Sequence, residues 1–118
     1  MNLIDAADVP TALRCCDADR ARALRASGAA SIQPAYDALR ALSSPMRLRL
    51  VGALAEVGEL CVCDAAFICD ASDALTSHHL KELVGAGFVD RRRDGRLAMF
   101  RLTPRGERAV EVVRELAR

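Results

Sequence analysis

Two cysteines separated by a single residue, Cys61 and Cys63, stand in the segment Glu59-Leu60-Cys61-Val62-Cys63-Asp64. Thiolate sulfurs are the ligands that soft metal ions prefer in proteins. In an extended strand the side chains of residues i and i+2 leave the same face, whereas on a regular helix they lie about 200° apart. We therefore expect this pair to chelate one soft ion, provided that the next helix begins after it.

Cys15 and Cys16 can complete such a site from a different part of the chain. Two sulfurs do not saturate a soft ion, so we expect a third ligand, and in one alternative a fourth, from this second pair. Adjacent cysteines point to opposite sides of an extended chain, and we predict that one binds firmly and the other conditionally. Cys69 stands alone. Because free cysteine is among the most buried residue types, we interpret Cys69 as structural.

The segment Ser77-His78-His79-Leu80-Lys81 lies about fifteen residues beyond the first cysteine pair and is similar to the middle of a DNA-reading helix. Such a helix would be capped by Ser72 and would stop at the glycines of residues 85–87. Its apolar stripe is expected on Leu75, His79, Leu80 and Leu83. With a short helix before it and a tight turn between them, this pattern predicts a helix-turn-helix motif.

The first turns of a reading helix enter the major groove of DNA. Ser77 and His78 are the best candidates for hydrogen bonds to base edges or phosphates, while Asp73 either caps the helix or accepts from a cytosine amino group. His79 is expected to pack inside. The predicted contacts of this helix with DNA are Ser72, Asp73, Ala74, Thr76, Ser77, His78 and Lys81.

Two apolar-rich segments, residues 88–92 and 97–102, follow and are separated by Arg93-Asp94-Gly95-Arg96. Asp-Gly is a strong hairpin signal, so the pattern predicts the two-stranded wing of a winged helix. Arginines of this wing can meet phosphates, and Arg96 at its tip can enter a minor groove. Arg93 and Arg96 are the predicted DNA contacts, and Arg91 and Arg92 are further phosphate candidates.

The remaining elements place these motifs in one small domain. We expect helices over residues 34–42 and 45–57, a short helix over 65–69 capped by Asp64, and a terminal helix from Pro104 to Arg118. Ser44 and Thr103 are the predicted caps of two of them. Residues 27–31 are interpreted as a break. We therefore divide the chain into a flexible arm, residues 1–30, and a DNA-binding and dimerisation domain, residues 31–118.

Composition agrees with a mostly helical protein that has a small β-hairpin. The chain has 118 residues, enough for one domain, and it contains one Tyr, three Phe and no Trp. The net charge is +1, but residues 81–118 carry ten Lys/Arg against six Asp/Glu, a balance of +4, whereas residues 1–80 have a balance of −3. The basic surplus therefore lies beside the predicted reading helix, where phosphates would be met.

No apolar run approaches the roughly 20 residues that a membrane span requires, and the amino terminus has no basic stretch before an apolar block. A cytoplasmic location is expected. In that reducing compartment the five cysteines of the chain favour metal or redox chemistry over a disulfide framework.

The order of these elements, together with residues 59–64, residues 77–80 and the wing segment 95–100, resembles the ArsR/SmtB family of metal-sensing repressors. The wing segment 95–100, together with cysteines upstream in the arm, makes the sequence most similar to its CadC-type branch, which senses cadmium and lead. The resemblance covers residues 32–118. It implies a dimeric winged helix, joined through terminal helices, that holds operator DNA without metal and releases it when metal binds, with arm cysteines donated across the dimer interface.

Two features depart from that branch. Its members have two arm cysteines a few residues apart, whereas Cys15 and Cys16 are adjacent here. Some relatives also carry a second, zinc-binding site on the terminal helix, but residues 103–118 contain no His. The predicted ligands are therefore Cys15, Cys16, Cys61 and Cys63 alone, for Cd(II) or Pb(II), with Zn(II) or As(III) as further effectors.

Three other functions are compatible with parts of this sequence. An arsenite- or antimonite-responsive repressor would share residues 59–64, but relatives of that kind commonly have a third cysteine at the position of Ala66. A redox or persulfide switch between arm and core cysteines would need accessible thiols of low pKa. An enzyme has the least support, because no third catalytic group accompanies the cysteines and histidines.

Overall fold

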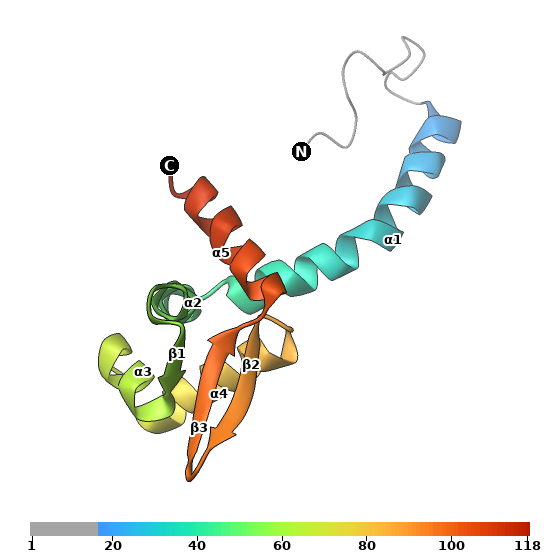
Figure 1. Ribbon diagram of the computed structural model, residues 1–118. Helices are drawn as coiled ribbons and strands as arrows, with labels where there is room; N and C mark the ends of the chain where they lie inside the picture. Colours follow the sequence, from blue (N-terminus) through green and yellow to red (C-terminus); the bar gives the residue numbers. More distant parts are fainter. Residues whose placement is uncertain (1–16) are drawn as a thin grey trace. The chain divides into compact units, whose positions relative to one another are not determined.

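A computed structural model describes residues 17–118, which form five helices and three strands (Figure 1). In chain order the elements are α1 (Ala18–Leu42), α2 (Pro45–Val57), β1 (Glu59–Cys61), α3 (Val62–Cys69), α4 (Asp73–Gly85), β2 (Val89–Asp94), β3 (Leu97–Leu102) and α5 (Pro104–Leu116). The predicted fold class, mostly helical with a small β-hairpin, is confirmed. Among the described residues no helix is long and apolar enough to span a membrane.

Helix α1 runs without interruption from Ala18 to Leu42 and contains Pro34 in its interior. The predictions of a break at residues 27–31 and of a helix beginning at residue 34 are therefore wrong. Alanine is the strongest helix former, and one glycine inside a helix costs only about 1 kcal/mol, so the Ala-rich segment stays helical through Gly28. The chain divides into two compact units, Met1–Tyr36 and Asp37–Arg118.

The core of the second unit is formed where α2 and α4 pack with the sheet and α5. Helix α2 buries Leu50, Val51 and Leu54 in it, and Met46 packs against this core from the start of the helix. The buried cluster consists of Leu50, Val51, Leu54, Leu60, Ala65, Cys69, Leu80, Leu83, Phe88, Val89, Phe100, Ala109 and Val110. This core holds α3 and α4 against the rest of the unit.

The predicted caps form at three helices. The side chains of Ser44, Ser72 and Thr103 each accept a hydrogen bond from the backbone N–H three residues later, at 3.3, 3.1 and 3.0 Å. These bonds satisfy donors that the first turn of a helix leaves unpaired. The Thr103 hydroxyl also donates to the carbonyl of Gly87 at 2.6 Å, which ties the start of α5 to the turn before β2.

The wing is part of a three-stranded antiparallel sheet with the order β1-β3-β2. The predicted hairpin is present as β2 and β3, and Gly95 at its turn has the positive φ of +61° that glycine tolerates. The third strand, β1, was not predicted as part of the sheet. It pairs with β3 through Leu60 opposite Phe100 and Cys61 opposite Met99.

Candidate metal centre and DNA-binding surface

Cys61 and Cys63 lie where β1 turns directly into α3. Cys61 is the N-cap of this helix, with extended backbone angles of φ −81° and ψ 168°, and the helix begins at Val62. The prediction that Asp64 caps a helix starting at Ala65 is therefore wrong. Because β1 is paired with β3 only as far as Cys61, the chain is free to turn there. Asp64 lies in the first turn, where a carboxylate complements the helix dipole.

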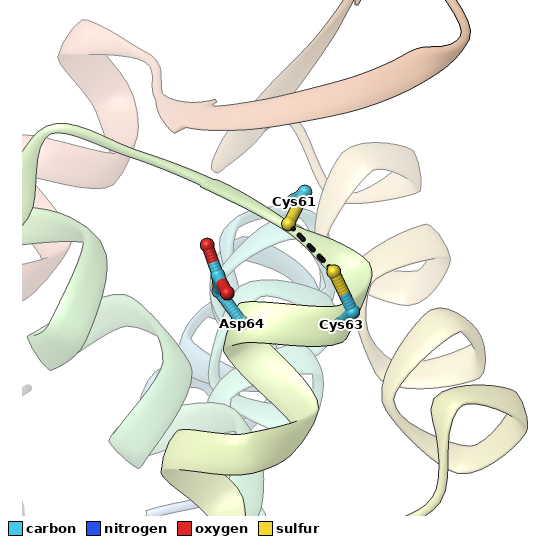
Figure 2. A group of neighbouring side chains, drawn as sticks. All are labelled: Cys61, Cys63 and Asp64. Carbon is cyan, nitrogen blue, oxygen red and sulfur yellow. Dashed lines mark hydrogen bonds between the residues drawn. The ribbon is translucent and has the colours of Figure 1, made fainter.

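The two sulfurs meet although the helix begins early. The Sγ atoms of Cys61 and Cys63 are 3.0 Å apart, and Figure 2 shows them facing each other across the junction. The condition that the helix must begin after Cys63 was too strict, because an extended N-cap residue directs its side chain over the first turn. The donor atoms of Cys61, Cys63 and Asp64 all lie within 4.8 Å of one another. Asp64, which the sequence predicts only as a helix cap, therefore adds a third donor to the group.

The environments of the two sulfurs differ. Cys61 is 6% exposed, whereas Cys63 is open to solvent. The hydrogen-bonded contact with Cys63 is the main cause that raises the pKa of Cys61; the backbone amide of Asp64 opposes the rise, while burial and the Asp64 carboxylate add to it. The raised pKa favours the protonated thiol of Cys61, and a metal ion that binds this sulfur must displace the proton.

The donor set fits a thiophilic ion. Two sulfurs that converge from one short stretch of backbone are soft ligands, and the adjacent carboxylate adds one oxygen that zinc also accepts. Cys69, by contrast, lies in the core, and burial is the main cause that raises its pKa, in agreement with the structural role that we predicted. Cys15 and Cys16 lie outside the described residues, so their part in the site stays a prediction.

Helix α4 presents most of the predicted reading residues to solvent. Ser72, Asp73, Ala74, His78 and Lys81 are exposed, and Ser77 is half-buried.

Thr76 is the exception, since its relative exposure is 0%. The prediction that Thr76 contacts DNA is therefore wrong. The buried stripe of α4 is Thr76, Leu80 and Leu83, at helical spacing, while Leu75 is 47% exposed instead. The helix is thus rotated by about one residue from the stripe that hydrophobicity alone suggested.

His79, which was expected to pack inside, is half-buried and is hydrogen-bonded to α2. Its Nδ1 accepts a hydrogen bond from Nε of Arg47 at 2.9 Å, so the proton of the neutral ring is on Nε2. Arg47 also donates from its guanidinium to the carbonyl of Ala41 at 3.2 Å. Burial is the main cause that lowers the pKa of His79, and the neighbouring charge of Arg47 lowers it further. The neutral ring therefore fastens the reading helix to α2.

The arginines of the wing are not equivalent. Arg93 and Arg96 are exposed, as the predicted contacts require. Arg92 instead donates two hydrogen bonds to the carboxylate of Glu59, from Nε at 2.6 Å and from Nη2 at 2.7 Å. The same bonds lower the pKa of Glu59. Arg92, a phosphate candidate from the sequence, is therefore already paired within the protein.

Comparison with known proteins agrees with this geometry. The family model for bacterial regulatory proteins of the arsR family matches residues 44–91. The cadmium resistance transcriptional regulatory protein CadC of Listeria innocua is 52% identical over 59 residues, which make up 50% of this chain and 50% of that protein. A solved structure of a possible transcriptional regulator for arsenical resistance is 37% identical, with a TM-score of 0.58, over 67% of this chain and 81% of that one. The chain belongs to the ArsR/SmtB family.

The helices and strands of the second unit correspond to those of a winged helix-turn-helix domain. A homodimeric winged helix-turn-helix DNA-binding domain from Mycobacterium bovis matches with a TM-score of 0.67 and 27% identity, over 75% of this chain and 82% of that one. Helices α3 and α4 are therefore the helix-turn-helix, and β2 with β3 is the wing. The family and fold are those of DNA-binding transcription regulators rather than of enzymes. The chain spans about half the length of the Listeria CadC relative.

Proposed function

We propose that the protein is a metal-responsive transcriptional repressor, which binds operator DNA as a homodimer in the cytoplasm and is released when a thiophilic ion binds. One observation carries the proposal: the Sγ atoms of Cys61 and Cys63 lie 3.0 Å apart at the start of α3, the first helix of the helix-turn-helix. A metal-binding group and a DNA-binding motif thus share one helix. The CadC-type sequence of this segment supports the same function.

The proposed ligands are Cys61 and Cys63 together with Cys15 and Cys16 from the arm. The family resemblance implies that the arm reaches the site across the dimer interface. Thiolates select cadmium and lead over harder ions, and similarity to a protein named for cadmium resistance supports Cd(II) or Pb(II) as the effector. Zn(II) would also be accepted by this set, because its structural sites use the same sulfur ligands.

The proposed DNA surface combines the outer face of α4 with the tip of the wing. The residues assigned to it are Ser72, Asp73, Ala74, Ser77, His78, Lys81, Arg93 and Arg96. Two such surfaces in a symmetric dimer would meet two half-sites on one duplex. Helix α5 supports a dimer, since Val112 and Leu116 are 56% and 77% exposed and are apolar. Burial against a second copy would remove them from water.

Release from DNA requires that the ion bind the DNA-free dimer more tightly than the DNA-bound one. The geometry supplies a source of that difference. Two sulfurs at zinc's bond length and tetrahedral angle lie about 3.8 Å apart, whereas the Sγ atoms of Cys61 and Cys63 lie 3.0 Å apart. Since Cys63 belongs to the first turn of α3, an ion that widens the pair acts directly on the helix-turn-helix.

Two titrations of the reduced protein test the proposal together. Cadmium is added while sulfur-to-metal charge-transfer absorbance is recorded, and in parallel the affinity is measured for a duplex that the protein selects from a random-sequence pool. We expect the absorbance to fall in Cys61→Ser and Cys63→Ser but not in the control Cys69→Ala. Duplex affinity should drop by about tenfold or more on metal binding. A duplex affinity that ignores saturating cadmium and lead refutes the proposal.

Arsenite is the second candidate effector, favoured by the similarity to a possible regulator for arsenical resistance. Arsenic in arsenite binds three sulfurs in a trigonal pyramidal arrangement. Ala66 occupies the position in α3 at which a cysteine would supply the third sulfur. The same titration with arsenite separates the two effectors by their relative potency in releasing the duplex. A thiol redox switch has less support, because the pKa of Cys61 is raised rather than lowered.

A further inference from the structure

The strand that carries Cys61 belongs to the same sheet as the wing. Cys61 pairs with Met99 of β3, and Met99 pairs in turn with Arg92 of β2. These three residues form one row across the sheet, and residues directly opposite one another in an antiparallel sheet share a face. The proposed metal centre and the arginine-rich strand of the wing therefore lie at opposite edges of one three-stranded sheet.

A side-chain bridge joins those two edges. Glu59 of β1 and Arg92 of β2 form a two-pronged ion pair across β3, with N–O distances of 2.6 and 2.7 Å. This bidentate geometry restricts the relative orientation of the two side chains more than a single bond would. The side chains of Arg91 and Arg93, the neighbours of Arg92, make no hydrogen bond or ion pair with any residue between positions 17 and 118. Of these three arginines, Arg92 is the one whose side chain is bound to a residue of β1.

The bridge starts two residues from Cys61, one of the two sulfur-bearing residues that an ion must separate. A tetrahedral ion requires the Sγ atoms to separate from 3.0 Å toward about 3.8 Å. Cys63 is exposed, but Cys61 is buried and is held in β1 by its pairing with β3. A displacement of Cys61 is therefore shared by the strand and carried to Glu59.

We propose that Glu59 and Arg92 are positioning residues that transmit metal binding at the cysteine pair to the wing. Without metal, the bridge holds β2 in the orientation in which Arg93 and Arg96 reach DNA. When β1 shifts around an ion, the bridge moves β2 with it, so that the wing loses its contacts together with the reading helix. This inference rests on the proposed function and adds a second route, separate from α3, between the metal centre and DNA.

The test measures a ratio rather than an affinity. For each variant, the dissociation constant for the selected duplex is determined with and without saturating Cd(II), and the ratio of the two reports the coupling. In Glu59→Gln and in Arg92→Gln we expect this ratio to fall by about threefold to fivefold relative to wild type, in line with the modest strength of a part-exposed pair. The double variant should lose no more than either single variant, because both remove the same bridge.

Two controls separate this role from a general effect of charge or folding. Glu56→Gln removes the same charge from the exposed end of α2 and should leave the ratio unchanged. Arg92→Lys keeps the charge but loses the two-pronged geometry, so it should behave like Arg92→Gln. Hydrogen exchange of the β2 amides should respond to Cd(II) in wild type and respond less in Glu59→Gln, while the charge-transfer absorbance of both stays equal.

The outcomes are distinct. If Cd(II) weakens duplex binding in wild type and equally in Glu59→Gln and Arg92→Gln, the bridge does not transmit metal binding, and the proposed function still stands. If Cd(II) leaves the duplex affinity of wild type unchanged, both the inference and the proposed function are overturned.

Discussion

Replacement of Gly106 by alanine should destabilise the protein because α5 approaches the backbone before β2 too closely for a side chain. A Cβ at this position would lie 2.0 Å from the carbonyl oxygen of Phe88 and 3.0 Å from Cδ2 of Leu102. That carbonyl already accepts a hydrogen bond from the N–H of Thr103 at 3.0 Å, so it cannot turn aside without losing the bond. The start of α5 would have to move away by about 1 Å or more.

The size of the effect follows from two opposing contributions. Overpacking of a well-packed site costs about 1–3 kcal/mol, and the upper part of that range applies because the obstacle is backbone. Alanine recovers up to about 1 kcal/mol through its higher helix propensity. We therefore expect Gly106→Ala to lower the free energy of unfolding by about 2 kcal/mol. The matched control is Gly52→Ala in α2, where nothing lies within 4 Å of the new Cβ. It should raise the free energy by about 0.5–1 kcal/mol.

Urea unfolding followed by far-UV circular dichroism measures both variants. Protein concentration is held constant, because the apparent stability of a dimer depends on it. Equal m-values across the three proteins would show that the same surface is exposed on unfolding. An unchanged free energy in Gly106→Ala, or a loss of similar size in Gly52→Ala, would refute the close approach of α5 to Phe88.

Three further predictions concern α4 and the wing. Thr76→Val should leave the free energy of unfolding unchanged or raise it by up to about 1 kcal/mol, because the buried Thr76 hydroxyl has no hydrogen-bond partner among residues 17–118; a larger loss in urea unfolding would reveal a partner. Folding lowers the pKa of His79, so below about pH 6.5 the unfolded chain binds more protons at this residue than the folded protein does. The contribution of His79 to the free energy of unfolding is therefore complete above that pH and is lost as the pH falls toward the pKa of the folded state. An NMR titration should find the pKa of His79 below its ordinary value and higher in Arg47→Met; an unmoved midpoint contradicts the contact. Neutralising Arg93 and Arg96 together should weaken binding to every duplex and reduce the salt slope by about one for each lost phosphate contact, whereas wild-type values of both would show that the wing does not touch DNA.

Features governed by local rules were predicted well from the sequence. Ser44 with Pro45, Ser72, and Thr103 with Pro104 each mark a helix start that the structure confirms. These residues act on backbone groups only a few positions away, so no tertiary context is needed. The Asp-Gly turn of the wing belongs to the same class, because positive φ at glycine is a local property.

Features that depend on distant partners were missed. Strand β1 exists because Leu60 pairs with Phe100, about forty residues away, and the same pairing moves the start of α3 from Ala65 to Val62. The sequence alone does not indicate which residues of β1 and β3 lie opposite each other. The bridge between Glu59 and Arg92 depends on this register, so it could not be predicted from the sequence either.

The rotation of α4 has a different cause. Hydrophobicity ranked Leu75 above Thr76 for the interior, but the packing of Leu80 and Leu83 decides which side of the helix is buried. Thr76 lies on the same side of the helix as these leucines and is buried, whereas Leu75 is exposed to solvent. The convergence of Cys61 and Cys63 was expected from their spacing, although the extended N-cap that produces it was not.

Cadmium-edge X-ray absorption spectroscopy of the Cd(II)-loaded protein tests most directly whether Cys61 and Cys63 bind one ion. Wild type should show a first shell dominated by sulfur, and Cys61→Ser and Cys63→Ser should each lose one sulfur from it. A shell of oxygen and nitrogen only, or a sulfur count that neither substitution changes, would contradict the metal centre on which the proposed function rests.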